Sequence, residues 1–390
     1  MNGNGISHKR LWNKDFIKLC MANFFLAMSV YMLLPVLPMW MAVPLSGNNE
    51  LIAPVIGVFG IGIFLLGGFS SFLIQKYRRN KVCILSTLVL AGIVLGMTYV
   101  ERELATMLDV SQLLALFIVA RLLSGAFYGL AYIVINSTLF VDCCESAQRT
   151  SANMLSGWFH RFAIVAGPLC GAFVDEELGT IDTMYVSAIA CAIAAGLIAS
   201  VVFPFKAPEE TIKVFCFDRF LTLHSGSIAV PVMLLAAGFG FLLSPFRSFI
   251  ACEAMAFGVV AAFVLYKLLS GANLTKLVIP FGYVLVGLSS VIFVGGFGIS
   301  LAVSAFMNAL GAAMLLARYD LLFINSSDHC QRGTSQSTFI LSVELGIAFG
   351  AAVSVFRYGN NVYVPAALFL LSASVYFVFT RKWVKLHLRK

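Results

Sequence analysis

The stretch SQSTFILSVELGIAFGAAVSVF, residues 335–356, is apolar along most of its length and carries a single charged side chain, Glu344. A helix needs about 20 predominantly apolar residues to cross a hydrocarbon core that is about 30 Å thick. Comparable runs, separated by short polar breaks, fill most of the remaining sequence. Their length predicts membrane-spanning helices, because the strands of a membrane barrel are alternating segments of only about 10 residues.

The composition supports the same fold class. Of the 390 residues, 60% are hydrophobic and 11% are charged, and the mean hydropathy is +0.94. These values exclude a soluble globular domain. The sequence therefore predicts an all-α polytopic membrane protein with twelve transmembrane helices. We expect the spans at residues 15–42, 51–74, 82–100, 111–138, 152–174, 182–204, 227–245, 247–268, 276–294, 298–320, 335–356 and 362–380.

Lysine and arginine residues gather on one side of the predicted spans. They cluster in residues 9–18, 76–81 and 381–390, whereas connections on the other side carry acids, as in 101–103 and 175–177. By the positive-inside rule, both termini are expected to be cytoplasmic. The same bias explains the net charge of +8, so no nucleic-acid partner is expected.

Nothing in the sequence indicates catalytic or cofactor chemistry. The nine cysteines show no metal-ligand spacing, and neither a phosphate-binding loop after a strand nor a Ser/His/Asp set stands out. We expect no enzymatic activity, no cofactor and no metal site. The first apolar segment is too long for the core of a signal peptide and is expected to remain as a span.

An internal repeat relates the two ends of the chain. At an offset of 183 residues, Gly167 aligns with Gly350 and Arg161 aligns with Glu344. The two repeats therefore present opposite charges at equivalent positions. Parallel six-plus-six repeats of this kind build many transporters around a site at mid-membrane.

The longest polar connection lies between the sixth and seventh predicted spans. It predicts an N-terminal six-helix bundle at residues 1–204, a cytoplasmic central loop at 205–226 and a C-terminal six-helix bundle at 227–390. Within the loop, a group of apolar residues predicts a short interfacial helix. These residues are Phe215, Phe217, Phe220 and Leu221.

Three charges, those of Arg121, Arg161 and Glu344, lie deep inside apolar segments. A charge in hydrocarbon is costly and usually faces a watery cavity or a partner. Glu344 is predicted to carry protons, and the alternative is a permanent Arg161 to Glu344 ion pair that fixes the two halves. Arg121 is predicted to bind an anionic substrate group or to influence a nearby acid, and the alternative is an arginine held by backbone carbonyls.

Several polar residues in the spans are candidates for lining a substrate cavity. Arg121 begins a stripe on one helix face that continues through Gly125, Tyr128 and Tyr132. The candidate cavity-lining residues are Asn23, Tyr31, Tyr128, Tyr132 and Asn308. The alternative for the asparagines and Tyr31 is hydrogen bonding between helices without a role in transport.

Three further titratable residues receive structural interpretations. Glu253 is expected to pair with Arg247 at the outer mouth, and the alternative is a buried proton site in the eighth span. Asp320 is expected at a solvated helix end. His160 points about 100° away from Arg161 on a helix, which favours a packed or lipid-facing histidine.

Motifs in several spans resemble those of the major facilitator superfamily, over nearly the whole chain. Residues 332–350 are similar to the tenth connection and eleventh helix of bacterial drug and sugar efflux permeases in that superfamily. The Arg121-x-x-x-Gly125 pattern is similar to the fourth-helix motif that the family associates with proton coupling. The stretch Gly167-Pro168-Leu169-Cys170-Gly171 resembles the fifth-helix motif of antiporters, although Ala172 replaces the final glycine.

The family signature between the second and third helices is eroded. Ser71, Gln75 and Arg78 replace its glycine, acid and second glycine, whereas its basic residues are retained, namely Lys76, Arg79 and Lys81. Gln75 can form a hydrogen bond but cannot form the ion pair of the family's inner gate. The resemblance implies conformational roles for Lys76, Arg79, Gly125, Gly167, Pro168 and Gly171.

The resemblance implies a proton-coupled secondary transporter in the bacterial cytoplasmic (inner) membrane. It would act as a monomer that exports small amphipathic organic compounds, with protons as the coupling ion. One alternative is uptake or facilitated diffusion of an anionic organic solute, because two intramembrane arginines outnumber one acid. A second alternative is a membrane receptor or scaffold that has the transporter fold without transport.

Overall fold

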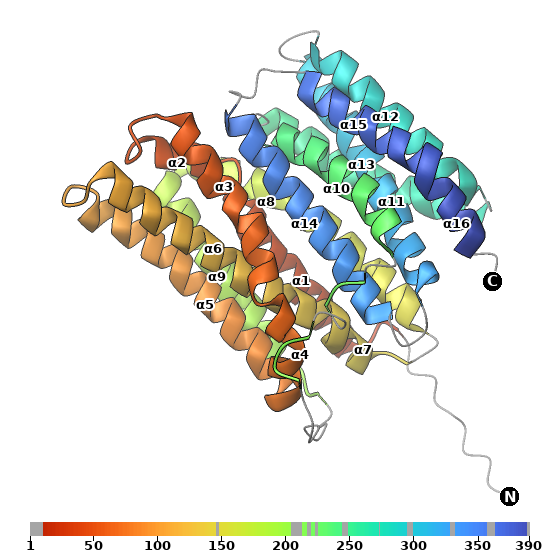
Figure 1. Cartoon of the computed structure of the whole chain (residues 1–390), viewed down its shortest axis with the longest axis horizontal. Helices are drawn as coiled ribbons and strands as arrows, with labels where there is room; N and C mark the ends of the chain where they lie inside the picture. The colour runs from red at the N-terminus through yellow and green to blue at the C-terminus, as the bar shows by residue number, and fades with distance from the viewer. Residues whose placement is uncertain are drawn as a thin grey trace, which may run out of the picture.

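The computed structural model describes residues 11–145, 148–203, 213–216, 220–222, 225–243, 249–272, 274–294, 299–327, 332–356 and 363–387. All regular secondary structure in these residues is helical (Figure 1). The α-helices are α1 (Lys14–Tyr31), α2 (Leu37–Ala42), α3 (Asn49–Leu65), α4 (Gly67–Lys76), α5 (Arg79–Tyr99), α6 (Val110–Val134), α7 (Phe140–Cys143), α8 (Arg149–Glu177), α9 (Thr180–Ala199), α10 (Gly226–Leu243), α11 (Phe249–Gly271), α12 (Val278–Val294), α13 (Ile299–Ser326), α14 (Arg332–Phe356), α15 (Tyr363–Val375) and α16 (Arg381–His387). Short turns of other helix types are η1 (Val100–Leu104), η2 (Ile135–Leu139), η5 (Thr275–Leu277) and η6 (Tyr376–Thr380). The predicted all-α fold is confirmed.

The helices account for the predicted spans. Among the described residues, ten helical segments are long and apolar enough to cross a membrane, and the bent pair of α3 and α4 forms an eleventh. These correspond to the second to twelfth predicted spans. The first predicted span is occupied by α1 followed by α2, which gives a twelve-span fold.

Two of the predicted spans are interrupted helices. In the first, residues 32–36 form turns between α1 and α2, and Pro35 lies in this break. Proline removes a backbone N–H and disfavours helical geometry in the residue before it. In the second, α3 and α4 meet at an angle of 45°, where Gly67 and Gly68 weaken the helix.

The helices form two groups. Helices α1 to α9 pack on one another, as do α10 to α16; in Figure 1 the first group runs from red to yellow-green and the second from green to blue. We call these groups the first half and the second half. They meet mainly where α3 lies along α14 and where α8 lies along α11. The predicted domain boundaries at residues 204 and 226 stay a prediction, because much of that connection lies outside the described residues.

Helix α14 approaches both of its neighbours closely because small residues line its two sides. Towards α10, a Cβ atom on Gly350 would overlap the backbone oxygen of Ala237. Towards α3, a Cβ atom on Gly60 would lie 2.8 Å from the Cβ of Ala348. Small residues allow such close backbone contact between membrane helices. As a result, α14 brings Glu344 to the boundary between the halves.

Residues 213–216 and 220–222, which we call the linker, dock at the break between α3 and α4. Phe220 is fully buried and lies against Gly67, with its ring 6.0 Å from that of Phe64. The backbone N–H of Cys216 donates to the backbone oxygen of Gly68 at 3.0 Å.

The linker also reaches the second half. The backbone N–H of Thr222 donates to Oγ1 of Thr338 in α14 at 2.9 Å. The predicted interfacial helix is wrong for the described part of this segment, which is not helical. Phe220 packs into the protein instead of facing lipid, while Phe217 lies outside the described residues.

Replacing Phe220 by alanine is expected to release the linker, because truncating a fully buried phenylalanine costs about 3–5 kcal/mol in a packed core. Limited trypsin digestion measures the release, since Lys213 lies in the linker, and cleavage there should be several times faster than in the unaltered protein. Val214→Ala is the control, because Val214 lies in the same part of the linker and is 54% exposed. Equal cleavage rates in the two variants would contradict docking by Phe220.

Candidate functional site

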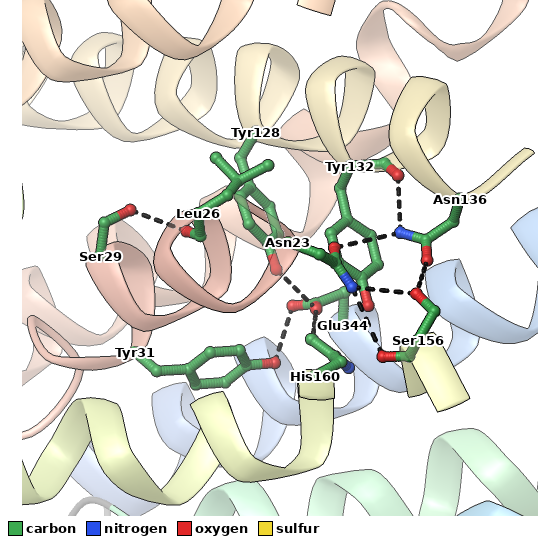
Figure 2. A network of polar contacts seen from close by, with 10 residues as sticks. All are labelled: Asn23, Leu26, Ser29, Tyr31, Tyr128, Tyr132, Asn136, Ser156, His160 and Glu344. Atoms are coloured by element: carbon green, nitrogen blue, oxygen red, sulfur yellow. Dashed lines mark hydrogen bonds and ion pairs between the residues drawn. The ribbon is translucent and has the colours of Figure 1, made fainter. Parts of the chain in front are cut away.

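Glu344 lies where the halves meet, and three helices of the first half contact its carboxylate (Figure 2). Tyr31 of α1 donates its hydroxyl to Oε2 at 2.9 Å, and Tyr128 of α6 donates to Oε1 at 2.9 Å. Nε2 of His160 in α8 lies 3.0 Å from Oε1. We call these four buried residues the Glu344 cluster. It joins α14 to the first half through side chains that can all exchange protons.

Glycines of α8 place two members of the cluster side by side. A Cβ atom on Gly171 would overlap the backbone oxygen of Met32, and one on Gly167 would lie 2.7 Å from the Cβ of Tyr31. The end of α1 therefore lies directly on α8. The rings of Tyr31 and His160 are consequently 5.9 Å apart, which lets both reach the same carboxylate.

The predicted stripe on α6 also faces the cluster. Tyr128 and Tyr132 are one turn apart, and their rings stack at 5.5 Å with an interplanar angle of 17°. The Tyr132 ring in turn lies 4.8 Å from the ring of His160. This packing fixes the imidazole beside the carboxylate.

A second charged contact crosses between the halves one residue further along α8. Nη2 of Arg161 donates to Oδ2 of Asp320 in α13 at 3.2 Å, and the two side chains are 3% and 0% exposed. The guanidinium lies 5.0 Å from the centre of the Trp158 ring, where cation–π attraction adds to the ion pair. Gly157 provides the space, since a Cβ atom there would lie 2.6 Å from Oδ2 of Asp320.

These contacts correct two interpretations of the sequence and decide a third. Arg161 does not pair with Glu344, because it is bonded to Asp320. Asp320 is not at a solvated helix end: α13 continues to Ser326 and buries it completely. His160 is packed, which is one of its two expected alternatives, and it contacts Glu344. Because His160 and Arg161 point about 100° apart on α8, each meets a different acid of the second half.

A ring of neutral hydrogen bonds lies beside the cluster (Figure 2). Asn23 Nδ2 donates to Ser156 Oγ at 3.2 Å, and Ser156 Oγ donates to Asn136 Oδ1 at 2.6 Å. Asn136 Nδ2 closes the ring by donating to Asn23 Oδ1 at 3.3 Å. The ring connects α1, η2 and α8 within the first half, which agrees with the helix-bonding interpretation of Asn23.

A cavity of about 10 Å³, close to the minimum that holds one water molecule, lies beside both charged contacts. Its lining includes Tyr132, His160 and Arg161 from the first half and Leu316, Phe339 and Val343 from the second. Gln336 of α14 also lines it. Nε and Nη1 of Arg161 and Oε1 of Gln336 have no hydrogen-bond partner in the part of the chain that the structure describes.

Arg121 lies apart from this cavity. It is 4% exposed, and its guanidinium lies 4.6 Å from the centre of the Phe59 ring. The Phe59 ring is 5.6 Å from that of Tyr128, so one aromatic side chain separates Arg121 from the Glu344 cluster. Within the described ranges Arg121 forms no ion pair, and its Nε has no partner.

The remaining candidates lie elsewhere. Asn308 is buried between α13 and α12, where its Nδ2 donates to Oγ of Ser289 at 3.2 Å; it is not part of the central site. Glu253 is exposed on α11, and its expected partner Arg247 lies outside the described residues.

The eroded signature between α4 and α5 still forms one ion pair. Nη1 of Arg79 lies 2.6 Å from Oδ2 of Asp142 in α7. Lys76 lies over the rings of Phe72 and Tyr77. In the described part of the chain, no three His, Cys, Asp or Glu side chains gather to hold a metal ion.

Sequence reasoning missed five members of the site. His160 and Asp320 were assigned structural roles, while Asn136, Ser156 and Gln336 were not selected. A signal for Asp320 was present, because the apolar residues from Leu321 to Ile324 continue its helix beyond the expected end. Ser156 and Gln336 carry no comparable signal, since lone polar residues are common in membrane helices.

Comparison with known proteins places these contacts in context. A family model described as Major Facilitator Superfamily matches residues 19–273. No curated protein gives a significant match in sequence.

Solved structures with a similar fold cover almost the whole chain. A crystal structure of a bacterial homologue of the iron transporter ferroportin, in an outward-facing state, is 17% identical with a TM-score of 0.65, covering 96% of this chain and 100% of that chain. The nucleoside transporter NupG is 14% identical with a TM-score of 0.61, and the match covers 95% of this chain and 99% of that chain. The E. coli fucose:proton symporter FucP is 12% identical with a TM-score of 0.62, and the match covers 96% of this chain and 99% of that chain. At these identities the similarity shows the fold alone.

Proposed function

Because the chain belongs to the Major Facilitator Superfamily, we propose that it is a proton-coupled secondary transporter of small organic compounds in which Glu344 carries the proton. Membership of this family makes it a multi-pass membrane transport protein and not an enzyme. One observation supports the proposal most directly. The Glu344 carboxylate is 3% exposed at the boundary between the halves and is bonded there to two phenols and an imidazole.

The hydrogen bonds of the cluster link the proton to the contact between the halves. An ionised carboxylate only accepts hydrogen bonds, so it suits three donors at once. A protonated carboxyl has an O–H group, and when this O–H points at one of the three partners, that contact breaks or reverses. Proton binding at Glu344 would therefore loosen the attachment of α14 to the first half. Such a change in a contact between halves is what alternating access needs.

We propose that the interface lets the two halves move relative to each other. Small residues separate α3 from α14, and rings of Trp158 and Phe263, 5.1 Å apart, separate α8 from α11. We propose that the two halves rock about these surfaces and expose the cavity to each side in turn.

The orientation and location are part of the same proposal. The basic residues near the linker, among them Lys76, Arg78 and Arg79, support a cytoplasmic position for this end and for both termini. We propose a monomer in a bacterial cytoplasmic membrane. This function has two modes. One is export of the substrate in exchange for protons, which the resemblance implies, and the other is uptake of the substrate together with a proton. They differ in whether proton and substrate bind at the same time.

Infrared titration tests the proton carrier without knowledge of the substrate. As the pH is lowered, we expect the C=O band of a buried carboxyl, shifted from the band of the exposed acids, to appear in the unaltered protein and to be missing in Glu344→Gln. Glu177→Gln, which alters an exposed acid at the end of α8, is the control and should keep the band. If Glu344→Gln also kept it, the proton would reside elsewhere and the proposal would fail.

A further inference from the structure

The cavity between the halves contains hydrogen-bonding groups that the described protein leaves unused. Nε and Nη1 of Arg161 and Oε1 of Gln336 have no partner, although both side chains are only 3% exposed. Buried polar groups are almost always paired, and leaving one unpaired is costly, most of all on a charged group. The two residues come from different halves and both line the cavity. They require a ligand that offers an acceptor to Arg161 and a donor to Gln336.

The buried charges indicate the sign of that ligand. Among the described residues, the buried Lys, Arg, His, Asp and Glu side chains at the centre of the protein are Arg121, Arg161, Asp320, Glu344 and His160. With Glu344 ionised and His160 neutral, the two arginines cancel the two carboxylates. One proton on Glu344 leaves an excess of one positive charge. An uncompensated charge at this depth is expensive, so the protonated site favours one negative charge on the ligand.

We propose that the substrate is a small organic monoanion, a carboxylate with a neighbouring hydroxyl or amide N–H, which binds between Arg161 and Gln336 together with one proton on Glu344, beside His160. This inference rests on the proposed function and deepens it by naming the substrate class and the coupling. Arginine is well suited to carboxylates, with which it forms strong charge-assisted hydrogen bonds.

The cavity wall fits the rest of such a molecule. Leu316, Phe339 and Val343 give the second half an apolar surface, which would cover the organic body while the carboxylate faces Arg161. The present volume of about 10 Å³ is far smaller than a ligand site of about 300 Å³ or more. Substrate binding therefore accompanies separation of the halves around the cavity.

The same charge balance couples the two species. The empty site and the site loaded with both proton and anion are neutral, whereas a site with only one of them carries a net charge. Moving a charge against the membrane potential costs about 2.3 kcal/mol per 100 mV. Only the neutral forms cross readily, so proton and anion travel together, one to one and without net charge movement.

The residues around His160 and Glu344 support this balance of buried charges. The other titratable or charged groups around them are Tyr31, Arg121, Tyr128, Tyr132, Arg161 and Asp320. Helices α3 and α10 also pack on α14. Near the pair, α3 contributes Phe59 and Gly60, and α10 contributes Ala237 and Gly240. These residues add no charge that would alter the balance.

The test uses the full-length protein and a panel of small carboxylic acids, each with its neutral primary amide: benzoate and benzamide, lactate and lactamide, mandelate and mandelamide. Thermal stabilisation is measured at pH 5.5 and pH 8, and proton uptake on binding is counted in weakly buffered solution. We expect at least one acid to bind about 10-fold more tightly than its amide and with about one proton taken up per molecule.

Two variants separate the parts of the inference. Arg161→Gln with Asp320→Asn keeps the net charge and a hydrogen-bonding pair, and it should bind the acid about 10-fold more weakly or worse while folding normally. Glu344→Gln should bind the acid without proton uptake and with little dependence on pH. Proton uptake in the unaltered protein that disappears in Glu344→Gln supports the proton carrier independently of the substrate class.

Three outcomes would overturn the inference. They are amides that bind as tightly as acids, acids that bind without proton uptake, and no stabilisation by any acid of the panel. Equal acid binding in the charge-neutral double variant would exclude Arg161 as the binding group. In each of these cases the proton-carrier proposal is still judged by the infrared band of Glu344, so the two failures are distinguishable.

Discussion

Replacing Glu344 by glutamine is expected to abolish accumulation of substrate by a pH gradient. Glutamine keeps the size of the side chain and can form hydrogen bonds, but it cannot carry a proton at this position. With one proton per substrate, a gradient of one pH unit supports about a 10-fold concentration ratio, since 1.4 kcal/mol corresponds to a factor of ten. In Glu344→Gln the ratio should fall to about one. Proteoliposomes loaded at one pH and diluted into another measure it with the panel acid that stabilises the protein most.

Two controls make this result specific. Exchange of labelled for unlabelled substrate at equal pH should continue in Glu344→Gln, because exchange needs the binding site and the moving halves but no net proton movement. Glu253→Gln, which changes an exposed acid of α11, should retain the full ratio. A normal ratio in Glu344→Gln would remove this residue from proton coupling.

Single substitutions in the Arg161 and Asp320 pair should be strongly destabilising. The two side chains are 3% and 0% exposed, so removal of one partner leaves a buried charge without compensation. Breaking a buried pair in this way costs about 3–5 kcal/mol. We expect both Arg161→Gln and Asp320→Asn to unfold at clearly lower temperature than the unaltered protein in detergent.

The double variant, Arg161→Gln with Asp320→Asn, should be more stable than either single variant. With both charges removed, the two introduced amide side chains would form a neutral pair, and neutral replacements of buried ion pairs are often well tolerated. Thermal unfolding of the four proteins gives the coupling between the two positions. Losses that simply add in the double variant would show that the two groups do not stabilise each other.

The fold class and the main acid of the site follow from the sequence, whereas the partners of that acid do not. Hydrophobic run length predicts spans, and a lone charge such as Glu344 marks a buried site at a known depth. Helical periodicity also places Tyr128 and Tyr132 on one face of α6. In the structure Tyr128 of this stripe contacts Glu344, whereas Arg121, where the stripe begins, lies over the Phe59 ring.

Partner identity depends on how two helices are rotated against each other, which no single span encodes. The repeat aligns Arg161 with Glu344 in depth, but depth alone does not make them face one another. In the structure the neighbouring His160 faces Glu344, and Arg161 faces Asp320 on a different helix. Asp320 was missed because its span was ended at that residue, next to Arg318, where a solvated end explains both charges.

The glycine contacts of α14 have a mechanical consequence. On the α10 side the two backbones touch at Gly350 and Ala237, and at Gly240 and Ile347, leaving no side-chain layer that could deform between them. A displacement of α14 that follows protonation of Glu344 would therefore move α10 as well, because the two helices form one rigid unit. The contact that has to change during this movement is the one between α14 and α3.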